Sequence, residues 1–568
     1  AGFVILLLPL AKAAADSFYL APGQSSFDDL SYHLTAVATW HRHGDLRMVK
    51  FSMGDSGTAF YPILSEISAW ALLAPFRDSD VAARWVELPF ALFSLVALAA
   101  VARRLGLSPR AAAFAVLLYA SIRRFFPVLA LGAGNDHAAA FFTLAALDGI
   151  LETAWKPRPG SAASTGLALG LLVGTKYIGV LNAATLLALL ALLVLVRRPR
   201  LAGTALAGLV ALLAVTMAIA GGYTYLRNAV TAGNPLFPAP LLGLPGWEGA
   251  TMAFRSQFPE YRIDVPRFLT ARPDLFGPLF PFTLLPAALL APFLALRKGP
   301  WTQRIETALV FALPAVFFLE FLYLMHDHRD VRYFASGIAL AAVAFAWLTE
   351  RIGPRAGVAI RALVLLAATA SVLARAFSPG KIFLGTLLVV AAALVATRWR
   401  PVRLPGLRWA GIAGLALLLI AMFPAGAAVA KYQRVKLRDQ TAAYTLEELA
   451  GPSGARIAYA GWNQPYLFFG SRLQNDVQYV PSTPSLAHQH YTWGGSPDVP
   501  LRSAGRYRTW RQNLERQKID YVVLFRSRWE NPERRWIVRH PEAFRLVYED
   551  SQTEIWEVRS PTAVTGVL

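Results

Sequence analysis

Apolar stretches alternate with short polar connections over most of this chain. Run length predicts membrane-spanning helices at 82–103, 110–127, 136–154, 162–174, 177–196, 203–222, 278–297, 305–325, 333–350, 357–376, 381–398 and 408–430. Together with an apolar segment at 2–15 these make about thirteen spans, each near the ~20 residues that cross a ~30 Å hydrocarbon core. The pattern predicts a polytopic helical membrane protein.

The apolar segment 2–15 is short for a span, and the small residues at 11–15 also suit a signal-peptide cleavage region. A first span whose beginning is missing is the favoured interpretation. Both alternatives carry the following loop across the membrane. We therefore expect the loop 16–80 on the outer face in either case.

Lysine and arginine gather in alternate connections, as the retention of positive charge on the cytoplasmic side produces. The clusters are Arg103, Arg104 and Arg110; Lys156 and Arg158; Arg197, Arg198 and Arg200; Arg297, Lys298 and Arg304; Arg351 and Arg355; and the segment 398–408. They share one side only if the apolar segment 58–76 does not cross and lies along the interface as an amphipathic helix. The outer face then receives 16–80, 132–135, the break at 174–176, 222–276 and 326–332.

Beyond Lys431 the apolar runs end and charges become frequent. Short β-rich stretches at 456–460, 521–525 and 553–558 alternate with a helical pattern at 506–518, which predicts a small α/β domain. The predicted fold class is thus an all-α polytopic membrane domain at 1–430, with interfacial helices in its first outer loop, followed by an extracytoplasmic α/β domain at 431–568.

Composition agrees with this class and excludes others. Of the 568 residues, 55% are hydrophobic and 16% charged. The net charge of +20 lies mainly in the short loops, so it indicates topology and no nucleic-acid partner. The absence of cysteine excludes disulfides and thiolate metal sites. Richness in alanine, arginine and leucine favours a prokaryotic inner or plasma membrane.

Acidic residues at the expected outer mouth are the first candidates for chemistry. Asp28 and Asp29 follow the first apolar segment, and Asp136 opens the span 136–154. Ionised groups are costly near a bilayer and tend to serve an ion, a substrate or a proton. For Asp136 an ordinary N-cap is the alternative interpretation. We take Asp28, Asp29 and Asp136 as candidate catalytic residues.

Lys176 interrupts the apolar stretch 162–196, which is too long for one span and too short for two comfortable ones. A helix break buried in protein would place a helix N-terminus beside the ammonium group, a combination suited to phosphate. A lysine that snorkels to the interface is the alternative.

These residues resemble the GT-C membrane glycosyltransferases, in particular the branch with protein O-mannosyltransferases and the lipid A aminoarabinose transferases. The likeness covers about residues 1 to 430. It rests on the order and spacing of Asp28-Asp29-Leu30-Ser31-Tyr32, Tyr61-Pro62, Arg84 with Pro89, Asp136, and the segment from Gly166 to Tyr177.

The resemblance implies a sugar donor linked to a polyprenyl monophosphate, with Asp28 at the reaction centre and Lys176 on the donor phosphate. Two departures matter. Relatives often have a histidine or lysine just before the proline of the interfacial helix, where this chain has Phe60-Tyr61 before Pro62, and many have glutamate where Asp29 stands. The first departure removes one expected phosphate contact.

Other outer-face residues are candidates for the same site. Arg227, Arg329 and Arg332 are candidate phosphate ligands, although arginine beside tyrosine at the end of a span is also a common interfacial anchor. The candidate substrate-binding side chains are Tyr32, His33, Tyr177 and Tyr333.

Displacement at an anomeric carbon needs a base for the acceptor proton and positive charge for the departing phosphate. An aspartate and a lysine supply both, so we expect inverting single displacement by a hexosyl or pentosyl transferase. The acceptor, which can be protein, lipid or glycan, stays open. A lipid or lipid-linked sugar flippase is the alternative function, and a non-catalytic envelope scaffold is a third.

We expect no cofactor and no metal. His326 with His328 and His488 with His490 are each paired at alternate positions, but neither pair has a third ligand near in sequence. A divalent cation at Asp28 and Asp136 is the alternative. Lys176 at the phosphate position favours protein cations in its place.

Overall fold

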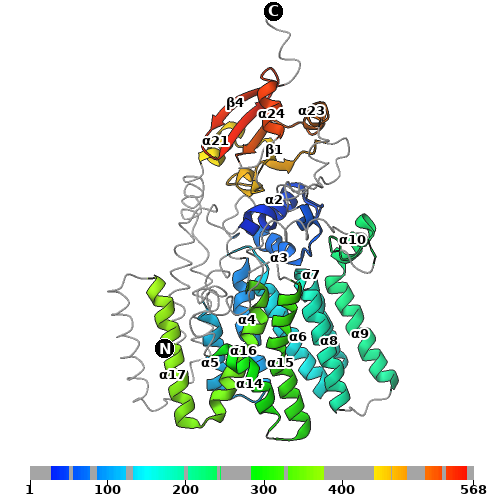
Figure 1. Cartoon of the computed structure of the whole chain (residues 1–568). Coiled ribbons are helices and arrows are strands. Elements are labelled where there is room, and N and C mark those ends of the chain that lie inside the picture. The colour runs from blue at the N-terminus through cyan, green and yellow to red at the C-terminus, as the bar shows by residue number, and fades with distance from the viewer. Residues whose placement is uncertain are drawn as a thin grey trace, which may run out of the picture.

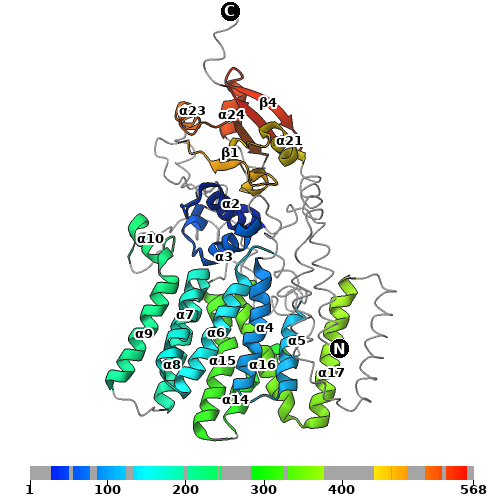
Figure 2. The ribbon, with the colours of Figure 1, turned by 180° about the vertical axis from the view of Figure 1, so that it is seen from behind.

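The computed structural model describes residues 27–49, 56–76, 83, 86–122, 132–197, 203–239, 243–244, 283–297, 299–324, 331–376, 441–461, 463–482, 506–526 and 532–559. A bundle of long helices, a layer of short helices and a small sheet are stacked in that order (Figures 1 and 2). The predicted spans at 2–15, 381–398 and 408–430 lie outside the described residues.

Each predicted span between 82 and 376 coincides with one helix of the bundle. These helices are α4 (Glu87–Arg104), α5 (Pro109–Ala120), α6 (Asp136–Trp155), α7 (Pro159–Thr175), α8 (Ile178–Arg197), α9 (Gly203–Gly221), α14 (Leu284–Ala295), α15 (Trp301–Leu324), α16 (Ala335–Arg351) and α17 (Pro354–Ala376).

Within the described residues, four helices are long and apolar enough to cross a membrane: Asp136–Trp155, Ile178–Arg197, Thr204–Gly221 and Arg332–Arg351. The chain is therefore an integral membrane protein of mostly helical structure. The expected count of about thirteen spans stays a prediction.

Glycines let α7 and α9 approach closely. A Cβ atom on Gly166 would lie 2.3 Å from the carbonyl oxygen of Leu213, and one on Gly170 would lie 2.5 Å from that of Met217. Small residues four positions apart are a common means of close packing between membrane helices. This contact fixes the end of α7, where the chain reaches Lys176.

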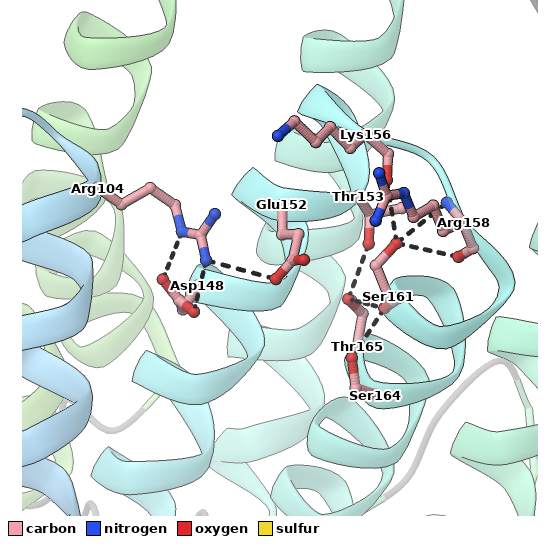
Figure 3. Close-up of polar contacts among 9 residues, drawn as sticks. All are labelled: Arg104, Asp148, Glu152, Thr153, Lys156, Arg158, Ser161, Ser164 and Thr165. Atoms are coloured by element: carbon pink, nitrogen blue, oxygen red, sulfur yellow. Dashed lines mark hydrogen bonds and ion pairs between the residues drawn. The ribbon is translucent and has the colours of Figure 1, made fainter.

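Within the part of the chain that the structure describes, the basic connections lie at the end of the bundle away from the sheet. Asn135 before α6 and Thr175 at the end of α7 are hydrogen-bonded, so the turn from α6 to α7 lies at the opposite end. Figure 3 shows that turn with Lys156 and Arg158, and beside it Arg104 reaches from α4 to Asp148 on α6, with Nε 2.6 Å from Oδ1.

Short helices form the layer between bundle and sheet. They are η2 (Asp29–His33), α2 (Leu34–His43), η3 (Ser56–Phe60), α3 (Leu64–Leu73) and η4 (Ala74–Phe76). The segment 58–76, expected along the interface, is this layer's η3, α3 and η4. In both views α3 lies above the ends of the long helices and not among them (Figures 1 and 2).

The C-terminal sheet has the strand order β2-β1-β3-β5-β4. Its elements are α21 (Thr441–Ala450), β1 (Arg456–Ala460), η10 (Pro465–Phe469), β2 (Asp476–Tyr479), α23 (Tyr507–Arg516), β3 (Tyr521–Phe525), α24 (Pro532–Arg539), β4 (Phe544–Glu549) and β5 (Thr553–Val558). β1 pairs in parallel with β2 and β3, and β5 pairs antiparallel with β3 and β4. The expected strands are β1, β3 and β5, and the expected helix is α23.

One hydrophobic core joins the sheet to the first-loop helices. Leu30 and Leu34 share a buried cluster with Ile457, Tyr459 and Phe468. Burial of this apolar surface on both sides holds the sheet over the first loop. The expected boundary at residues 430 and 431 lies outside the described residues and stays a prediction.

A buried carboxylate ties three helices together at the far end of the bundle. Glu306 of α15 accepts a hydrogen bond from Trp155 Nε1 of α6 at 2.8 Å and pairs with the guanidinium of Arg197 on α8. Glu306 is 3% exposed, and its loss removes the shared partner of the Trp155 indole N–H and the Arg197 guanidinium.

We expect Glu306→Ala to lower the free energy of unfolding by about 2 kcal/mol, because hydrogen bonds to charged groups contribute about that much. Thermal unfolding of the purified protein in detergent measures this. The control is Glu152→Ala, which removes an exposed contact 3.4 Å from Arg104 and should change stability by less than about 1 kcal/mol. Equal unfolding midpoints for both variants would contradict the prediction.

Candidate active site

Four charged side chains from distant parts of the chain meet at the sheet end of the bundle. Lys176 Nζ lies 2.5 Å from Asp136 Oδ1, and Arg332 Nη1 lies 3.8 Å from Asp136 Oδ2. Arg332 also pairs through Nη2 with Asp28. The structure thus brings Asp28, Asp136, Lys176 and Arg332 into one continuous ion-pair cluster.

The ends of α6 and α7 hold the two most deeply buried side chains of the cluster. Asp136 is the first residue of α6. Lys176 directly follows the end of α7 and has an extended backbone. Asn135 Nδ2 donates to the carbonyl oxygen of Thr175 at 3.1 Å, which locks the two helix ends together. The side chain of Lys176 is 12% exposed. Its ammonium therefore pairs inside the protein and does not extend to the interface.

Arg332 and Asp28 come from two other segments of the chain. Arg332 lies in η9 (Val331–Phe334), just before α16, and Asp28 precedes the π-helical turn η2. Such turns are frequent at functional sites. Two carboxylates face two cations, so the buried charges compensate one another. A phosphate group could replace either carboxylate as the partner of the cations, since both offer charged oxygens to N–H donors.

Tyr333 and Tyr32 border the cluster. The ammonium of Lys176 lies 4.1 Å from the centre of the Tyr333 ring, a distance at which cation and ring attract. Burial, and next the carboxylate of Asp28, raise the pKa of Tyr32 well above its ordinary value. The phenol of Tyr32 therefore stays protonated and can donate a hydrogen bond.

A cleft lies beside Tyr32. Its lining includes Tyr32, Trp40, Tyr61, Glu66 and Arg227. Arg227 Nη2 donates to the carbonyl oxygen of Tyr61 at 3.4 Å, and burial lowers its pKa from the ordinary value. The structure thus places Arg227 on this cleft and not in the ion-pair cluster, and Arg329 lies outside the described residues.

His33 forms a buried pair with Glu66, a residue that the sequence analysis did not identify. His33 Nδ1 lies 2.5 Å from Glu66 Oε1 of α3, and both residues are buried. Asp29 is buried on the same turn as His33. Glu66 lies inside an apolar segment expected at the interface, so an acid in that position was the available signal.

Tyr177 and Asn228 hold the loops that border the cleft. The Tyr177 hydroxyl donates to the carbonyl oxygens of Phe60 and Phe237, at 3.0 Å for Phe60. Asn228 of α10 (Tyr223–Ala232) donates to the Phe60 carbonyl oxygen at 2.8 Å and to the Phe237 carbonyl oxygen at 3.2 Å. These residues position η3 and the segment after α10.

Glu87 is a second acid that sequence reasoning missed. Its side chain is 1% exposed, and Oε2 accepts a hydrogen bond of 2.6 Å from the backbone N–H of His137. The first turn of a helix leaves such N–H groups without intrahelical partners. Glu87 therefore braces the start of α6, where Asp136 lies. Pro89 follows on α4, and Arg84 lies outside the described residues.

Among the described residues, no group of three His, Asp or Glu side chains is arranged to hold a metal ion. The histidines at 326, 328, 488 and 490 lie outside that part of the chain. Metal independence stays a prediction.

Comparison with known proteins agrees with this architecture. Residues 59–228 match the family of dolichyl-phosphate-mannose-protein mannosyltransferases. Among curated protein sequences, none matches the chain.

Two solved structures of one protein, ArnT, share the fold over nearly the whole length of this chain. ArnT from Cupriavidus metallidurans bound to undecaprenyl phosphate is 16% identical, with a TM-score of 0.52 and coverage of 98% of both chains. Its apo state gives 15% identity, a TM-score of 0.54 and the same coverage. An oligosaccharyltransferase from Archaeoglobus fulgidus is 14% identical, with a TM-score of 0.47 over 92% of this chain and 68% of that one. The expected resemblance to GT-C membrane glycosyltransferases is confirmed at the level of the fold.

The geometry of the cluster predicts how Asp136→Asn responds to anions. The variant leaves Lys176 and Arg332 with one carboxylate between them, so its thermal stability should fall. Inorganic phosphate in the millimolar range should then raise the unfolding midpoint of the variant more than that of the original protein, because it binds the folded state selectively. Differential scanning fluorimetry measures both shifts.

Lys176→Met in the Asp136→Asn background is the control, since it removes the cation that phosphate would contact. Equal phosphate shifts in the original protein and in Asp136→Asn would show that the cations do not accept an oxyanion.

Proposed function

We propose that this chain is a membrane glycosyltransferase that moves a sugar from a polyprenyl phosphate to an acceptor hydroxyl. The supporting observation is the convergence of Asp28, Asp136, Lys176 and Arg332 at one end of the bundle. The family match over 59–228 and the fold shared with ArnT support the same activity. ArnT was solved with undecaprenyl phosphate, which supports a polyprenyl carrier here.

The donor phosphate binds at Lys176 and Arg332. Its oxygens take over the Arg332 N–H donors that now face Asp28 and accept a further hydrogen bond from the ammonium of Lys176, which has three N–H donors. Release of Arg332 from Asp28 frees that carboxylate to accept a proton. Asp136 keeps the ammonium of Lys176 in place, and Tyr333 shields one face of it.

The transfer is a single displacement. Asp28 takes the proton of the acceptor hydroxyl as its oxygen attacks the anomeric carbon, and the bond between that carbon and the phosphate oxygen breaks. Lys176 and Arg332 stabilise the charge that develops on the departing prenyl phosphate. Attack opposite the leaving group inverts the anomeric configuration.

The remaining candidate residues act around this centre. Tyr32 donates from its protonated phenol to a sugar oxygen, and Asp29 and His33 hold the turn that carries Asp28. Arg227 contributes to the adjoining cleft. Protein cations serve the phosphate, so no divalent metal takes part in this mechanism.

The site belongs to the extracytoplasmic face in a prokaryotic inner or plasma membrane. The basic connections at the opposite end of the bundle support this orientation, because such loops stay in the cytoplasm. A flippase would instead place its charged groups near mid-membrane in paired broken helices. The convergence of charges at helix ends favours transfer, and the fold gives no support to a transporter.

Asp28→Asn should lower the rate of sugar transfer by about 10²–10⁴-fold, the usual contribution of a general base. Release of prenyl phosphate from a panel of prenyl-phosphate hexoses and pentoses, with and without acceptor extracts, measures the rate and identifies the sugar. Asp45→Asn is the matched control, since Asp45 is an exposed acid of the same loop that pairs with Arg47. Full transfer by folded Asp28→Asn would refute the assigned base.

A further inference from the structure

The helix α10 exposes a row of apolar side chains at the sheet end of the bundle. Tyr223, Leu226 and Val230 follow one another at intervals of three and four residues, which places them on one side of the helix. Each of the three is more than half exposed. Thr224 and Asn228 lie on the opposite side and are buried. The apolar side of α10 therefore faces away from the protein.

This row continues the exposed side of α9. Val215 and Ile219 of α9 are also more than half exposed, and with Tyr223 they keep a spacing of four residues. α9 packs closely on α7 with its other side, and it is long and apolar enough to cross a membrane. Because the chain is an integral membrane protein, the exposed side of such a helix faces lipid. The row on α10 is thus continuous with a surface that lipid covers.

The length of α9 places the start of α10 at the edge of the hydrocarbon core. α9 has 19 residues, which span about 28 Å at 1.5 Å per residue, close to the ~30 Å thickness of that core. Gly222 alone separates the two helices, so Tyr223 lies where the hydrocarbon ends. Tyrosine is enriched at this depth, since its ring is apolar and its hydroxyl polar. Figures 1 and 2 show α10 just beyond the end of α9, beside the layer of short helices.

Charge does not oppose contact with lipid. Between Gly203 and Ala239 the sequence has no acidic residue and a single basic one, Arg227. Arg227 stands next to Leu226 and turns its guanidinium to the carbonyl oxygen of Tyr61. α10 therefore presents to lipid neither a carboxylate that lipid phosphates would repel nor a charge that the hydrocarbon would have to accommodate.

We infer that α10 lies in the bilayer leaflet on the side of the sheet, with Tyr223, Leu226 and Val230 inserted at the boundary between headgroups and acyl chains. Amphipathic helices bury their apolar side about 5–10 Å into this boundary. The inference concerns the membrane alone and does not rest on the proposed transferase function.

Insertion ties the border of the cleft to the membrane surface. Lipid holds α10 on its exposed side, and Asn228 holds it on the other through the carbonyl oxygens of Phe60 and Phe237. The segments that carry these two carbonyl groups are thereby kept at a fixed depth relative to the headgroups.

Quenching by lipids labelled at different depths tests this. The chain has no cysteine, so a single introduced cysteine carries a fluorophore at one known position. Leu226→Cys and Val230→Cys are labelled and placed in nanodiscs that hold one copy of the chain. The lipid bears a nitroxide quencher either next to the headgroup or near the end of the acyl chain. We expect the headgroup-side nitroxide to quench both labels at least about twofold more strongly than the chain-end nitroxide.

Val210→Cys and Gln512→Cys are the controls. Val210 is exposed near the middle of α9, so the chain-end nitroxide should quench its label more strongly. Gln512 is exposed on α23 of the C-terminal domain, and neither nitroxide should quench its label. All four positions are exposed, so the variants should keep the unfolding midpoint of the original protein.

Labels at Leu226 and Val230 that respond like the label at Gln512 would overturn the inference, since α10 would then lie in water or beneath protein. Stronger quenching by the chain-end nitroxide would also overturn it, because α10 would then extend into the hydrocarbon core. Quenching that disappears in nanodiscs with two copies would assign the row to a second copy of the chain. None of these results depends on sugar transfer, since the assay contains neither donor nor acceptor.

Discussion

Mutual compensation of charge at the ends of α6, α7 and α16 is the constraint on which the site depends. Asp136, Lys176 and Arg332 lie in or next to segments that the bilayer excludes from water, where an unpaired charge is costly. Pairing makes their burial possible and fixes where the helix ends meet. The same pairing keeps two cations ready for an oxyanion, because a ligand that brings its own negative charge can exchange with a carboxylate.

The C-terminal sheet completes this arrangement from the other side. Ile457 of strand β1 and Phe468 of the adjoining η10 share a core with Leu30, which lies in the turn η2, and with Leu34, which directly follows it. The position of Asp28 therefore depends on residues more than 400 positions later in the chain.

The sequence predicted the structure best where one property, such as apolar character or positive charge, extends over a whole segment. Apolar run length predicted the helices from α4 to α17, and alternate basic loops predicted that Asp28, Asp136 and Lys176 share one end of the bundle. The roles of Glu66 and Glu87 could not be predicted, because each depends on one contact, with His33 and with the backbone of His137, whose geometry no periodicity encodes. Arg227 was expected on the phosphate, but its distance from the cluster depends on how α10 packs.

The hydrogen bonds by which Tyr177 and Asn228 hold two segments beside the cleft have a mechanical consequence. Both side chains bind the same two carbonyl oxygens, those of Phe60 and Phe237. Neither segment can swing outward alone without breaking bonds to both side chains at once. Outward movement of either segment therefore costs its hydrogen bonds to both side chains together.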